Sequence, residues 1–421
     1  MTLRTRELFN LLVVGVLTGL GFASVYIARQ DEISAGSLSY AAFFVGLYLV
    51  AHVVARMTVP HADPYLLPMA ALLTAIGVTE IYRLEPQDAF RQGLWVVIAV
   101  ALFSATLLVL RRDYRRLESY KYLFGLGAIL LLVLPAVPGL GVTINGANLW
   151  VRVGGLQFQP GEIAKLMLIV FLAGYLREKR EVLAQGRLKD LGPLLVIWGG
   201  AMLVLVQTND LGSALLYFGI FLAMLYVATG RLAYVAAGLA LFVAGSYGAY
   251  QTLPRVEDRI AVWADPWQYA DKEGYQLVQS TYSIGAGGFG GTGLGRGTFE
   301  TTAGNQLIPA LNTDFIYSAL AQELGLVGAA ALLLVYMLFV MRGFRSALLA
   351  GDGFSKLLAA GLTFGFALQT FIILGGILRL IPLTGITLPF VSYGGSSVLA
   401  NFVLLAGLML VSNRANALRR R

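Results

Sequence analysis

The sequence predicts an all-α, polytopic membrane protein with about twelve transmembrane helices. Of its 421 residues, 57% are hydrophobic and only 13% are charged, whereas a soluble globular domain is about 45–50% apolar and about 25% charged. Its apolar runs are too long and too numerous for the core helices of a soluble protein, since about 20 apolar residues span the hydrocarbon core of a membrane. The 49 glycines suit membrane helices that pack closely through small residues.

The candidate spans follow one another along the chain with mostly short connections. Their approximate limits are 8–27, 37–59, 64–82, 93–110, 119–138, 160–176, 191–206, 211–229, 232–250, 314–341, 354–378 and 388–411. No small-residue cleavage site precedes the first run, so we expect a retained helix rather than a signal peptide. The one long connection, 251–313, contains Trp, Tyr, Arg, acidic residues and a glycine-rich tract. Connections of this length are commonly functional, and we expect this one to be ordered.

The distribution of basic residues predicts the orientation in the membrane. If the N-terminus lies inside, the segments RRDYRRLESYK, REKREVLAQGRLK, RGFRS and NRANALRRR all lie in the cytoplasm. This arrangement agrees with the positive-inside rule, and the opposite orientation does not. We therefore predict that both termini are cytoplasmic and that the loop 251–313 lies outside. The net charge of +8 then reflects topology, and no nucleic acid is expected as a partner.

Several kinds of site are excluded by composition or by spacing. The chain has no cysteine, which rules out disulfides, thiolate catalysis and cysteine-ligated metals. His52 and His61 are the only histidines and cannot build a zinc site with ordinary ligands, and no dedicated cluster of metal ligands is visible. The tract GAGGFGGTGLGRG lacks the GK[ST] ending of a phosphate-binding loop and the strand and helix that flank one. We interpret it as a turn-rich loop against the membrane face.

The unusual polar residues within or beside the predicted spans gather at one predicted membrane face, the outer one. They are Arg152, Glu162, Lys165, Asp210, Arg255, Arg259 and Asp314. Ionisable residues at membrane depth are candidate functional residues by default. Their convergence on one face is stronger support for a site than any single residue.

Each of these residues also has a purely structural interpretation. Asp314 could cap the tenth span, since Asp, Asn and Thr all accept from free helix N–H groups. Glu162 and Lys165, three residues apart, could form a structural ion pair just after Pro160, which suits a helix start. Glu323 lies about 13 Å deeper than Asp314 at 1.5 Å per residue and on the opposite helix face. We expect Glu323 to brace a neighbouring helix rather than to form a catalytic pair with Asp314.

Five ordered blocks resemble those of the SEDS family (shape, elongation, division and sporulation), which includes RodA-like and FtsW-like proteins. The blocks are NLWVRVGGLQFQPGEIAKL, NDLGSAL, DPWQYADKEGYQLVQSTYSIGAGGFGGTGLGRG, NTDFIYSALAQELGLVG and IPLTGITLPFVSYGGSS. The resemblance implies a ten-helix core in 64–421, preceded by an extra helix pair in 1–63. It favours the RodA-like elongation branch, with an FtsW-like division protein as the alternative. Asn209 and Arg379 depart from the family pattern, which has proline and glycine at these positions.

The resemblance also implies an activity, partners and a site. Members of the family are peptidoglycan glycosyltransferases of the bacterial cytoplasmic membrane that polymerise lipid II at the outer face, beside a class B penicillin-binding protein that crosslinks the strands. The essential aspartate of the family's TDF motif is Asp314 here. The substrate-binding positions implied by the family motifs are Trp150, Arg152, Glu162, Lys165, Asp210, Arg255, Arg259, Gln276, Gln279, Ser280, Ser392 and Ser396.

This assignment predicts an inverting glycosyl transfer. Asp314 would be the general base for the acceptor hydroxyl, and basic residues would hold the diphosphate of the undecaprenyl-linked chain that leaves. A divalent cation, Mg²⁺ or Mn²⁺, could share that charge while bound mainly to the substrate. Two alternatives from other classes are a transporter that flips lipid II and a non-catalytic scaffold. Transporters usually place coupling residues at the midplane within inverted repeats, and neither feature is visible in this sequence.

Overall fold

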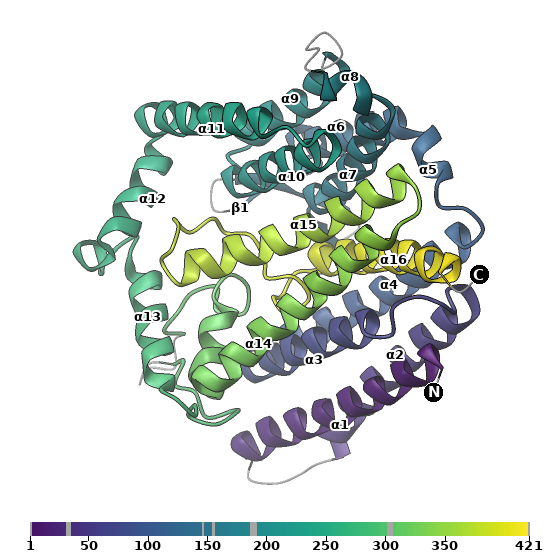
Figure 1. The fold of residues 1–421 in the computed structure, drawn as a ribbon. Helices are drawn as coiled ribbons and strands as arrows, with labels where there is room; N and C mark the ends of the chain where they lie inside the picture. The colour runs from purple at the N-terminus through teal and green to yellow at the C-terminus, as the bar shows by residue number, and fades with distance from the viewer. Residues whose placement is uncertain are drawn as a thin grey trace.

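The computed structural model describes residues 2–30, 35–144, 147–153, 156–185, 192–300 and 306–419. These ranges form a bundle of long helices that run side by side (Figure 1). One end of the bundle carries α12 (Pro254–Ala264) and α13 (Tyr275–Gly287), and the other carries the start of the first helix and the end of the last. The prediction of an all-α polytopic membrane protein is confirmed.

A helix covers each predicted span. The helices of the bundle are α1 (Leu3–Gln30), α2 (Ala35–Thr58), α3 (Leu66–Leu84), α4 (Pro86–Leu110), α6 (Lys121–Val133), α7 (Pro160–Glu178), α9 (Gly192–Gln207), α10 (Leu211–Thr229), α11 (Leu232–Thr252), α14 (Ile316–Leu349), α15 (Gly353–Ile377) and α16 (Gly395–Leu418). Short elements connect them, namely α5 (Arg116–Ser119), η1 (Leu134–Ala136), α8 (Arg180–Ala184) and η3 (Pro266–Tyr269).

Nine helices in the described part of the chain are long and apolar enough to cross a membrane. The helix α9 and the continuous pair α6–η1 are apolar but shorter. The helix α7 has the required length but carries charged residues at both ends. The total of twelve spans therefore stays a prediction.

Two predicted boundaries are wrong. The last span was expected to begin at 388, but α16 begins at Gly395, and residues 378–394 form an irregular segment that we call the 378–394 loop. Pro389 has no N–H for a helix hydrogen bond, and Phe390 has a φ of 64°, which a helix does not accommodate. The span expected from 93 begins at Pro86 instead, where proline is tolerated in the first turn.

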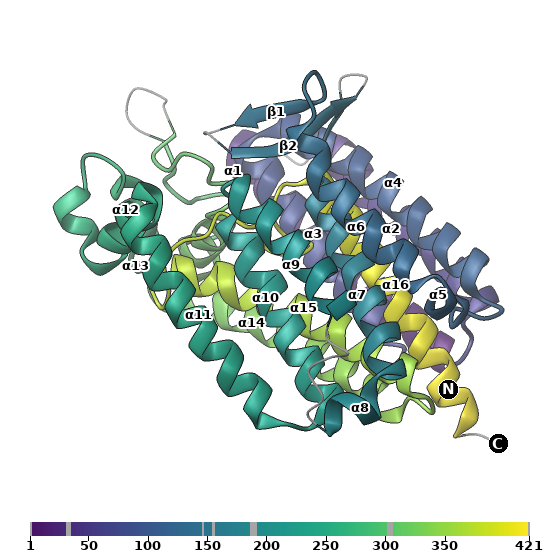
Figure 2. The same ribbon diagram turned by 90° about the horizontal axis from the view of Figure 1, so that it is seen from above.

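A small antiparallel sheet precedes α7 and was not expected. It consists of β1 (Gly141–Ile144), β2 (Ala147–Val153) and β3 (Leu156–Phe158) in the order β1-β2-β3. Trp150 lies opposite Val142, and Arg152 lies opposite Gln157. Figure 2 shows β1 and β2 at the edge of the bundle. Trp150 and Arg152 are therefore held on a strand rather than on an irregular connection.

The helix α14 is interrupted at Gly325, where φ is 66° and ψ is −171°. The glycine tract, residues 285–297, packs against this break. It forms hydrogen bonds with the backbone groups of α14 that the break leaves without a partner in the helix. Thr292 N donates to Gln322 O at 3.0 Å, and Leu326 N donates to Gly288 O at 2.9 Å. Because a lipid-exposed backbone group has no water to bind, such pairing inside the protein is what allows a helix to break at membrane depth.

Glu323 holds the same tract. Its carboxylate accepts from Gly295 N at 2.6 Å and from Gly297 N at 3.0 Å. It also forms an ion pair of 3.3 Å with Arg83 of α3. Glu323 was expected to brace a neighbouring helix, and it joins α3, α14 and the glycine tract. The tract is rich in turns and packs over the break in α14.

Candidate functional site

Asp314 lies in a tight turn just before α14. Its backbone N–H donates to the carbonyl of Ala310 at 3.1 Å, and Ala310 has a φ of 57°. The N-cap residue of α14 is Phe315, and no side chain caps this helix. The structural interpretation of Asp314 as a helix cap is therefore wrong in this structure.

Asp210 provides the contrast, because it does cap a helix. Its Oδ1 atom accepts from Ser213 N at 2.9 Å at the start of α10. Among the residues that the structure describes, no backbone N–H donates to the carboxylate of Asp314. Burial raises the pKa of Asp314 to about 6, although the Thr313 side chain and the positive charge of Arg259 lower it. Asp314 is thus a half-buried carboxylate whose pKa lies close to neutral pH.

The 378–394 loop encloses the Asp314 turn. The Ser392 hydroxyl donates to Thr313 O at 2.5 Å, and Tyr393 N donates to Asn312 O at 2.9 Å. A Cβ atom on Gly385 would lie 3.7 Å from Asp314 Oδ2. Two of the blocks that predicted the site are therefore in direct contact, although they lie far apart along the chain.

A second set of hydrogen bonds joins the start of α7 to the same loop. Lys165 Nζ donates to Glu162 Oε2 at 2.8 Å and to Gln369 Oε1 at 2.5 Å. Gln369 Nε2 in turn donates to Thr387 O at 3.0 Å. The Lys165 side chain is only 3% exposed. The predicted ion pair is therefore present, and it is extended by a glutamine of α15 that the sequence interpretation did not include.

Arg259 of α12 interacts electrostatically with the carboxylates of Asp210 and Asp314. Burial and the nearby positive charge of Arg255 lower the pKa of Arg259, whereas the negative charges of Asp210 and Asp314 raise it. This guanidinium group is therefore close enough to both aspartates to interact with their charges. Arg255, one helical turn earlier, brings a second cation to the same face.

Arg379 fixes α12 to the 378–394 loop. Its carbonyl accepts from Trp263 Nε1 at 3.0 Å, and its guanidinium donates to Trp263 O at 3.3 Å. The same guanidinium lies over the ring of Trp267 at 5.4 Å. Arg379 has a φ of 60°, which explains why glycine, the residue of the family pattern, suits this position. The arginine adds contacts to α12 that glycine cannot make.

Backbone strain concentrates at the candidate site. In the described part of the chain, the non-glycine residues with positive φ are Asn209, Ala310, Arg379 and Phe390. Asn209 immediately precedes Asp210, Ala310 holds the turn of Asp314, and the other two lie in the 378–394 loop. Such strain persists only where the surrounding structure imposes it, and it is common at functional sites.

Other predicted site residues lie in neighbouring elements. Arg152 is exposed on β2, and Gln276 and Gln279 are half-buried on α13. In the described ranges, no hydrogen bond or ion pair joins these three to Asp314. Their assignment to substrate, like that of Trp150, stays a prediction.

The three predicted serines are buried and already bonded within the protein. Ser280 Oγ lies 2.6 Å from Ser318 Oγ, Ser396 Oγ accepts from Gln159 N at 2.7 Å, and Ser392 binds Thr313. These contacts hold neighbouring segments together, and the assignment of the three serines to substrate stays a prediction. The sequence interpretation missed Gln369, although an amide inside an apolar run is itself a signal of a functional or packing role.

Within the ranges that the structure describes, no three His, Asp or Glu side chains converge as metal ligands. Asp210 and Asp314 are the carboxylates that interact with Arg259, and Asp210 is already engaged as a helix cap. This donor set fits a cation that is shared with a substrate, as Mg²⁺ commonly is, rather than a dedicated cage.

Comparison with known proteins gives consistent matches. Residues 61–417 match the sequence profile of the FtsW/RodA/SpoVE family, described as cell cycle proteins. The chain is 41% identical to the peptidoglycan glycosyltransferase RodA of Mycobacterium leprae, over 98% of this chain and 91% of that protein. It is 33% identical to the probable peptidoglycan glycosyltransferase FtsW of Geobacter metallireducens, over 84% of this chain and 95% of that protein.

Two solved structures share the fold. One is a chain from a study of how a peptidoglycan synthase complex coordinates polymerisation and crosslinking, with a TM-score of 0.70 and 28% identity over 84% of this chain and 98% of that chain. The other is the rod shape-determining protein RodA of Thermus thermophilus, with a TM-score of 0.61 and 27% identity over 84% of this chain and 97% of that chain.

Proposed function

The chain belongs to the FtsW/RodA/SpoVE family of cell cycle proteins, and from this premise we propose that it is a peptidoglycan glycosyltransferase of the RodA type. It polymerises lipid II into glycan strands at the outer face of the bacterial cytoplasmic membrane, during cell elongation. The higher identity to RodA than to FtsW relatives, 41% against 33%, supports the elongation branch.

Asp314 acts as the general base of the reaction. Its carboxylate takes the proton from the 4-hydroxyl of the acceptor N-acetylglucosamine, whose oxygen then attacks the anomeric carbon of the growing chain. The bond from that carbon to undecaprenyl diphosphate breaks, and its electron pair leaves with the diphosphate, so the configuration inverts. A base works best when its pKa lies near the operating pH, and the pKa of Asp314 is about 6.

Arginine side chains bind the diphosphate that leaves. Arg259 of α12 interacts with the charge of Asp314, Arg255 lies one helical turn earlier, and Arg152 lies exposed on β2. A guanidinium can bind phosphate oxygens with two parallel hydrogen bonds. We assign a different role to Lys165. Its ammonium group donates to Glu162 and Gln369, and Gln369 is bonded to the 378–394 loop. Lys165 therefore positions that loop. A substrate-bound Mg²⁺ or Mn²⁺, when present, neutralises diphosphate charge.

A class B penicillin-binding protein is the partner that crosslinks the strands, in keeping with the synthase complex that this chain resembles. With both termini inside, as the basic segments predict, α12 and α13 lie outside. Of the nine long apolar helices that the structure describes, α11 is the least buried, with only 6% of its apolar stretch inside the protein. We place part of the partner surface along α11 and α12.

The catalytic assignment rests on one observation. The carboxylate of Asp314 caps no helix, and it lies among strained loops, close enough to Arg259 to interact with its charge. The test uses purified protein, alone and with its cognate penicillin-binding protein, incubated with labelled lipid II and Mg²⁺. Glycan products are resolved by size for wild type, Asp314→Asn and the control Asp352→Asn. Asp352 caps α15 at the opposite end of the bundle.

We expect a product ladder from wild type and from the Asp352→Asn control, and none from Asp314→Asn. A wild-type ladder from a folded Asp314→Asn protein would remove Asp314 from the chemistry. Absence of a ladder from the folded wild-type complex would overturn the assignment of the chain as a polymerase and would favour a transporter or a scaffold.

A further inference from the structure

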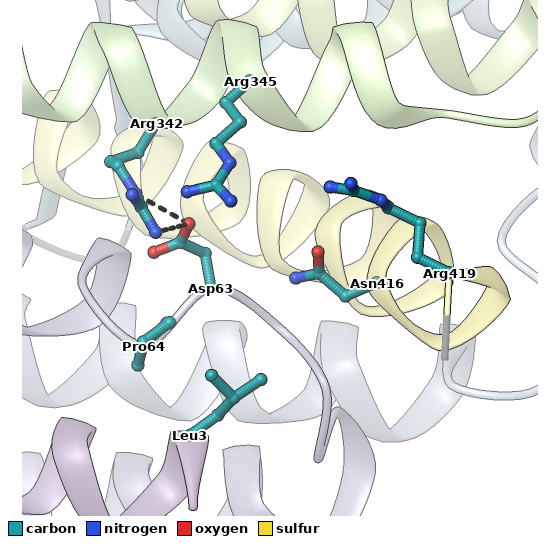
Figure 3. Close-up of a pocket in the computed structure, with 7 residues that line it drawn as sticks. All are labelled: Leu3, Asp63, Pro64, Arg342, Arg345, Asn416 and Arg419. Atoms are coloured by element: carbon teal, nitrogen blue, oxygen red, sulfur yellow. Dashed lines mark hydrogen bonds and ion pairs between the residues drawn. The ribbon is translucent and has the colours of Figure 1, made fainter. Parts of the chain in front are cut away.

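A basic pocket lies at the end of the bundle opposite Asp314, between α1, α14 and α16 (Figure 3). Its volume is about 290 Å³. It is lined by Leu3 of α1, Asp63 and Pro64 of the connection between α2 and α3, Arg342 and Arg345 of α14, and Asn416 and Arg419 at the end of α16. The candidate glycosyltransferase site uses none of these residues.

The pocket carries more positive than negative charge. Arg342 is paired with Asp63, with Nε 2.7 Å and Nη2 2.5 Å from the same Oδ2 atom. The other oxygen of Asp63 accepts from Tyr65 N at 3.0 Å, and the ring of Tyr65 lies 4.8 Å beneath the Arg342 guanidinium. The one carboxylate of the pocket is therefore fully engaged with one of its three arginines.

The other two arginines of the pocket are Arg345 and Arg419. In the described part of the chain, neither side chain has a hydrogen bond or an ion pair. Figure 3 shows both guanidinium groups directed into the space between α14 and α16, on the same side of Asp63. Two like charges that share a cavity repel each other, and an anion bound between them would remove that repulsion.

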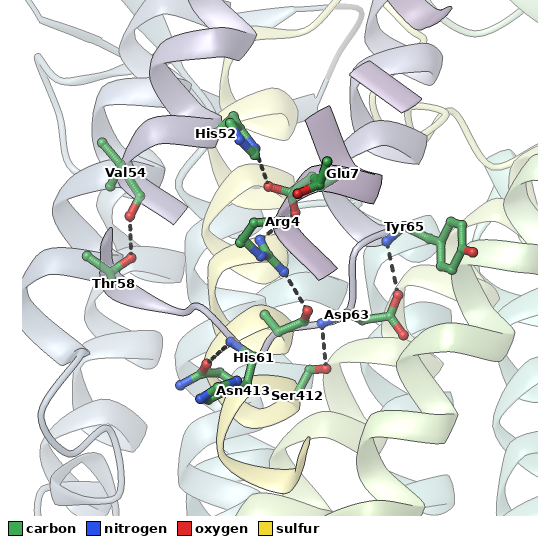
Figure 4. Close-up of polar contacts among 12 residues, drawn as sticks. Arg4, Glu7, His52, Val54, Thr58, His61, Asp63, Tyr65, Ser412 and Asn413 are labelled. Carbon is green, nitrogen blue, oxygen red and sulfur yellow. Dashed lines mark hydrogen bonds and ion pairs between the residues drawn. The ribbon is translucent and has the colours of Figure 1, made fainter. Parts of the chain in front are cut away.

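The floor of the pocket is rigid because the connection between α2 and α3 is tied down from two sides (Figure 4). From α1, Arg4 Nη2 donates to Ala62 O at 2.5 Å. From α16, Ser412 Oγ accepts from Asp63 N at 3.0 Å, and Asn413 Oδ1 accepts from His61 N at 2.8 Å. A pocket held in this way does not need to reorganise when a ligand binds, which favours affinity.

The first helix also depends on this region. Glu7 pairs with Arg4 at 2.5 Å and with His52 Nδ1 at 2.7 Å, which ties α1 to α2 (Figure 4). Both helices precede the part of the chain that matches the family, which begins at residue 61. The extra helix pair therefore supplies one wall of the pocket and anchors its floor.

We propose that this pocket binds a phosphate group, presented by the headgroup of an anionic membrane phospholipid. Guanidinium groups match the geometry of phosphate oxygens and bind them with charge-assisted hydrogen bonds. The pocket lies where α1 begins and α16 ends, both helices long and apolar enough to cross a membrane. Lipid headgroups are expected at such helix ends, and basic pockets between membrane helices bind anionic lipids. A soluble phosphate ester would satisfy the same arginines, and the experiment separates the two sources.

The test measures binding rather than enzyme activity. The full chain, purified in detergent, is titrated with phosphatidylglycerol or with phosphatidylcholine, and the bound lipid is counted by native mass spectrometry. Parallel titrations use glycerol 3-phosphate and inorganic phosphate. The variant is Arg345→Gln/Arg419→Gln. The control is Arg111→Gln/Arg112→Gln, which removes two exposed arginines after α4 at the same end of the bundle.

We expect the wild type to bind phosphatidylglycerol in preference to phosphatidylcholine, with binding weakened roughly tenfold or more in the Arg345/Arg419 variant and unchanged in the control. Displacement of the lipid by glycerol 3-phosphate or inorganic phosphate at micromolar concentration would support the phosphate site but identify a soluble ligand. Equal binding by the variant and the wild type, or equal losses in the variant and the control, would overturn the proposal. Because all four arginines are exposed, each variant is expected to fold, and melting temperatures verify this.

Discussion

The hydroxyl group of Ser392 donates a 2.5 Å hydrogen bond to the carbonyl of Thr313, the residue immediately before Asp314. The same hydroxyl accepts from the backbone N–H of Leu388 at 3.0 Å. One buried side chain thus fixes the 378–394 loop and the Asp314 turn against each other. The position of Asp314 therefore depends on a serine that lies two helices further along the chain, after α14 and α15.

Replacing this serine tests that dependence. Ser392→Ala leaves the Thr313 carbonyl and the Leu388 N–H without their partner, which typically costs about 1–3 kcal/mol. A displacement of Asp314 by 1 Å would reduce turnover by about 10²-fold. Thermal unfolding and lipid II polymerisation measure the two effects. Ser346→Ala, which removes a buried hydroxyl within α14, serves as the control and should keep its activity.

The activity should depend on pH through Asp314. A base must be ionised, and burial raises the pKa of Asp314 from its ordinary value of 3.8 to about 6. We expect kcat/KM to fall about tenfold per pH unit below 6 and to level off above it. Initial rates of polymerisation between pH 5 and 8 measure the profile. A flat profile across this range would contradict the assignment of Asp314 as the base.

The charge on Arg259 should shift that profile. Its positive charge lowers the pKa of Asp314, so Arg259→Gln should move the acid limb of the profile to higher pH. Lys272→Gln removes an exposed cation from the same segment and should leave the limb in place. If Arg259 acts only on the diphosphate, the rate falls but the limb does not move.

Asp314 should reduce stability at neutral pH. A carboxyl group with a raised pKa stabilises the folded state while it is protonated, and this contribution is lost as the pH rises from about 4 through 6. Asp314→Asn should therefore be more stable than the wild type at pH 8, by up to about 3 kcal/mol for a shift of this size. The difference should shrink towards pH 4. Melting temperatures across this range measure it, and a less stable variant at pH 8 would refute the prediction.

The ion pair of Glu162 and Lys165 should be structural. Lys165→Met leaves the half-buried carboxylate of Glu162 and the side chain of Gln369 without the ammonium, at a cost of up to about 3–5 kcal/mol, the range for a fully buried pair. The double variant Glu162→Gln/Lys165→Met removes both charges and should recover part of the loss, as a double-mutant cycle of melting temperatures would report. If Lys165 binds the diphosphate instead, the single variant loses lipid II affinity while its melting temperature stays unchanged.

The positions of the helices and the identity of the central carboxylate could be predicted from the sequence. A long apolar run is a local property, and it forms a helix in a membrane because every backbone group must be bonded within its own segment. The same logic failed where the chain leaves regular structure. The start of α16, the sheet that carries Arg152 and the break of α14 at Gly325 depend on backbone partners from distant segments.

The sequence by itself determined a polytopic membrane protein with Asp314 at the start of a span, because hydropathy and motif spacing are written along one chain. It left open whether Asp314 caps that span or serves a functional site. Only the tertiary structure decided against the cap, since Asp314 lies beside Gly385 and Arg259 and accepts from no backbone N–H of the described residues, whereas Asp210 accepts from Ser213 N. The role of a carboxylate depends on which donors and charges the packing brings to it, and those come from segments far apart in the sequence.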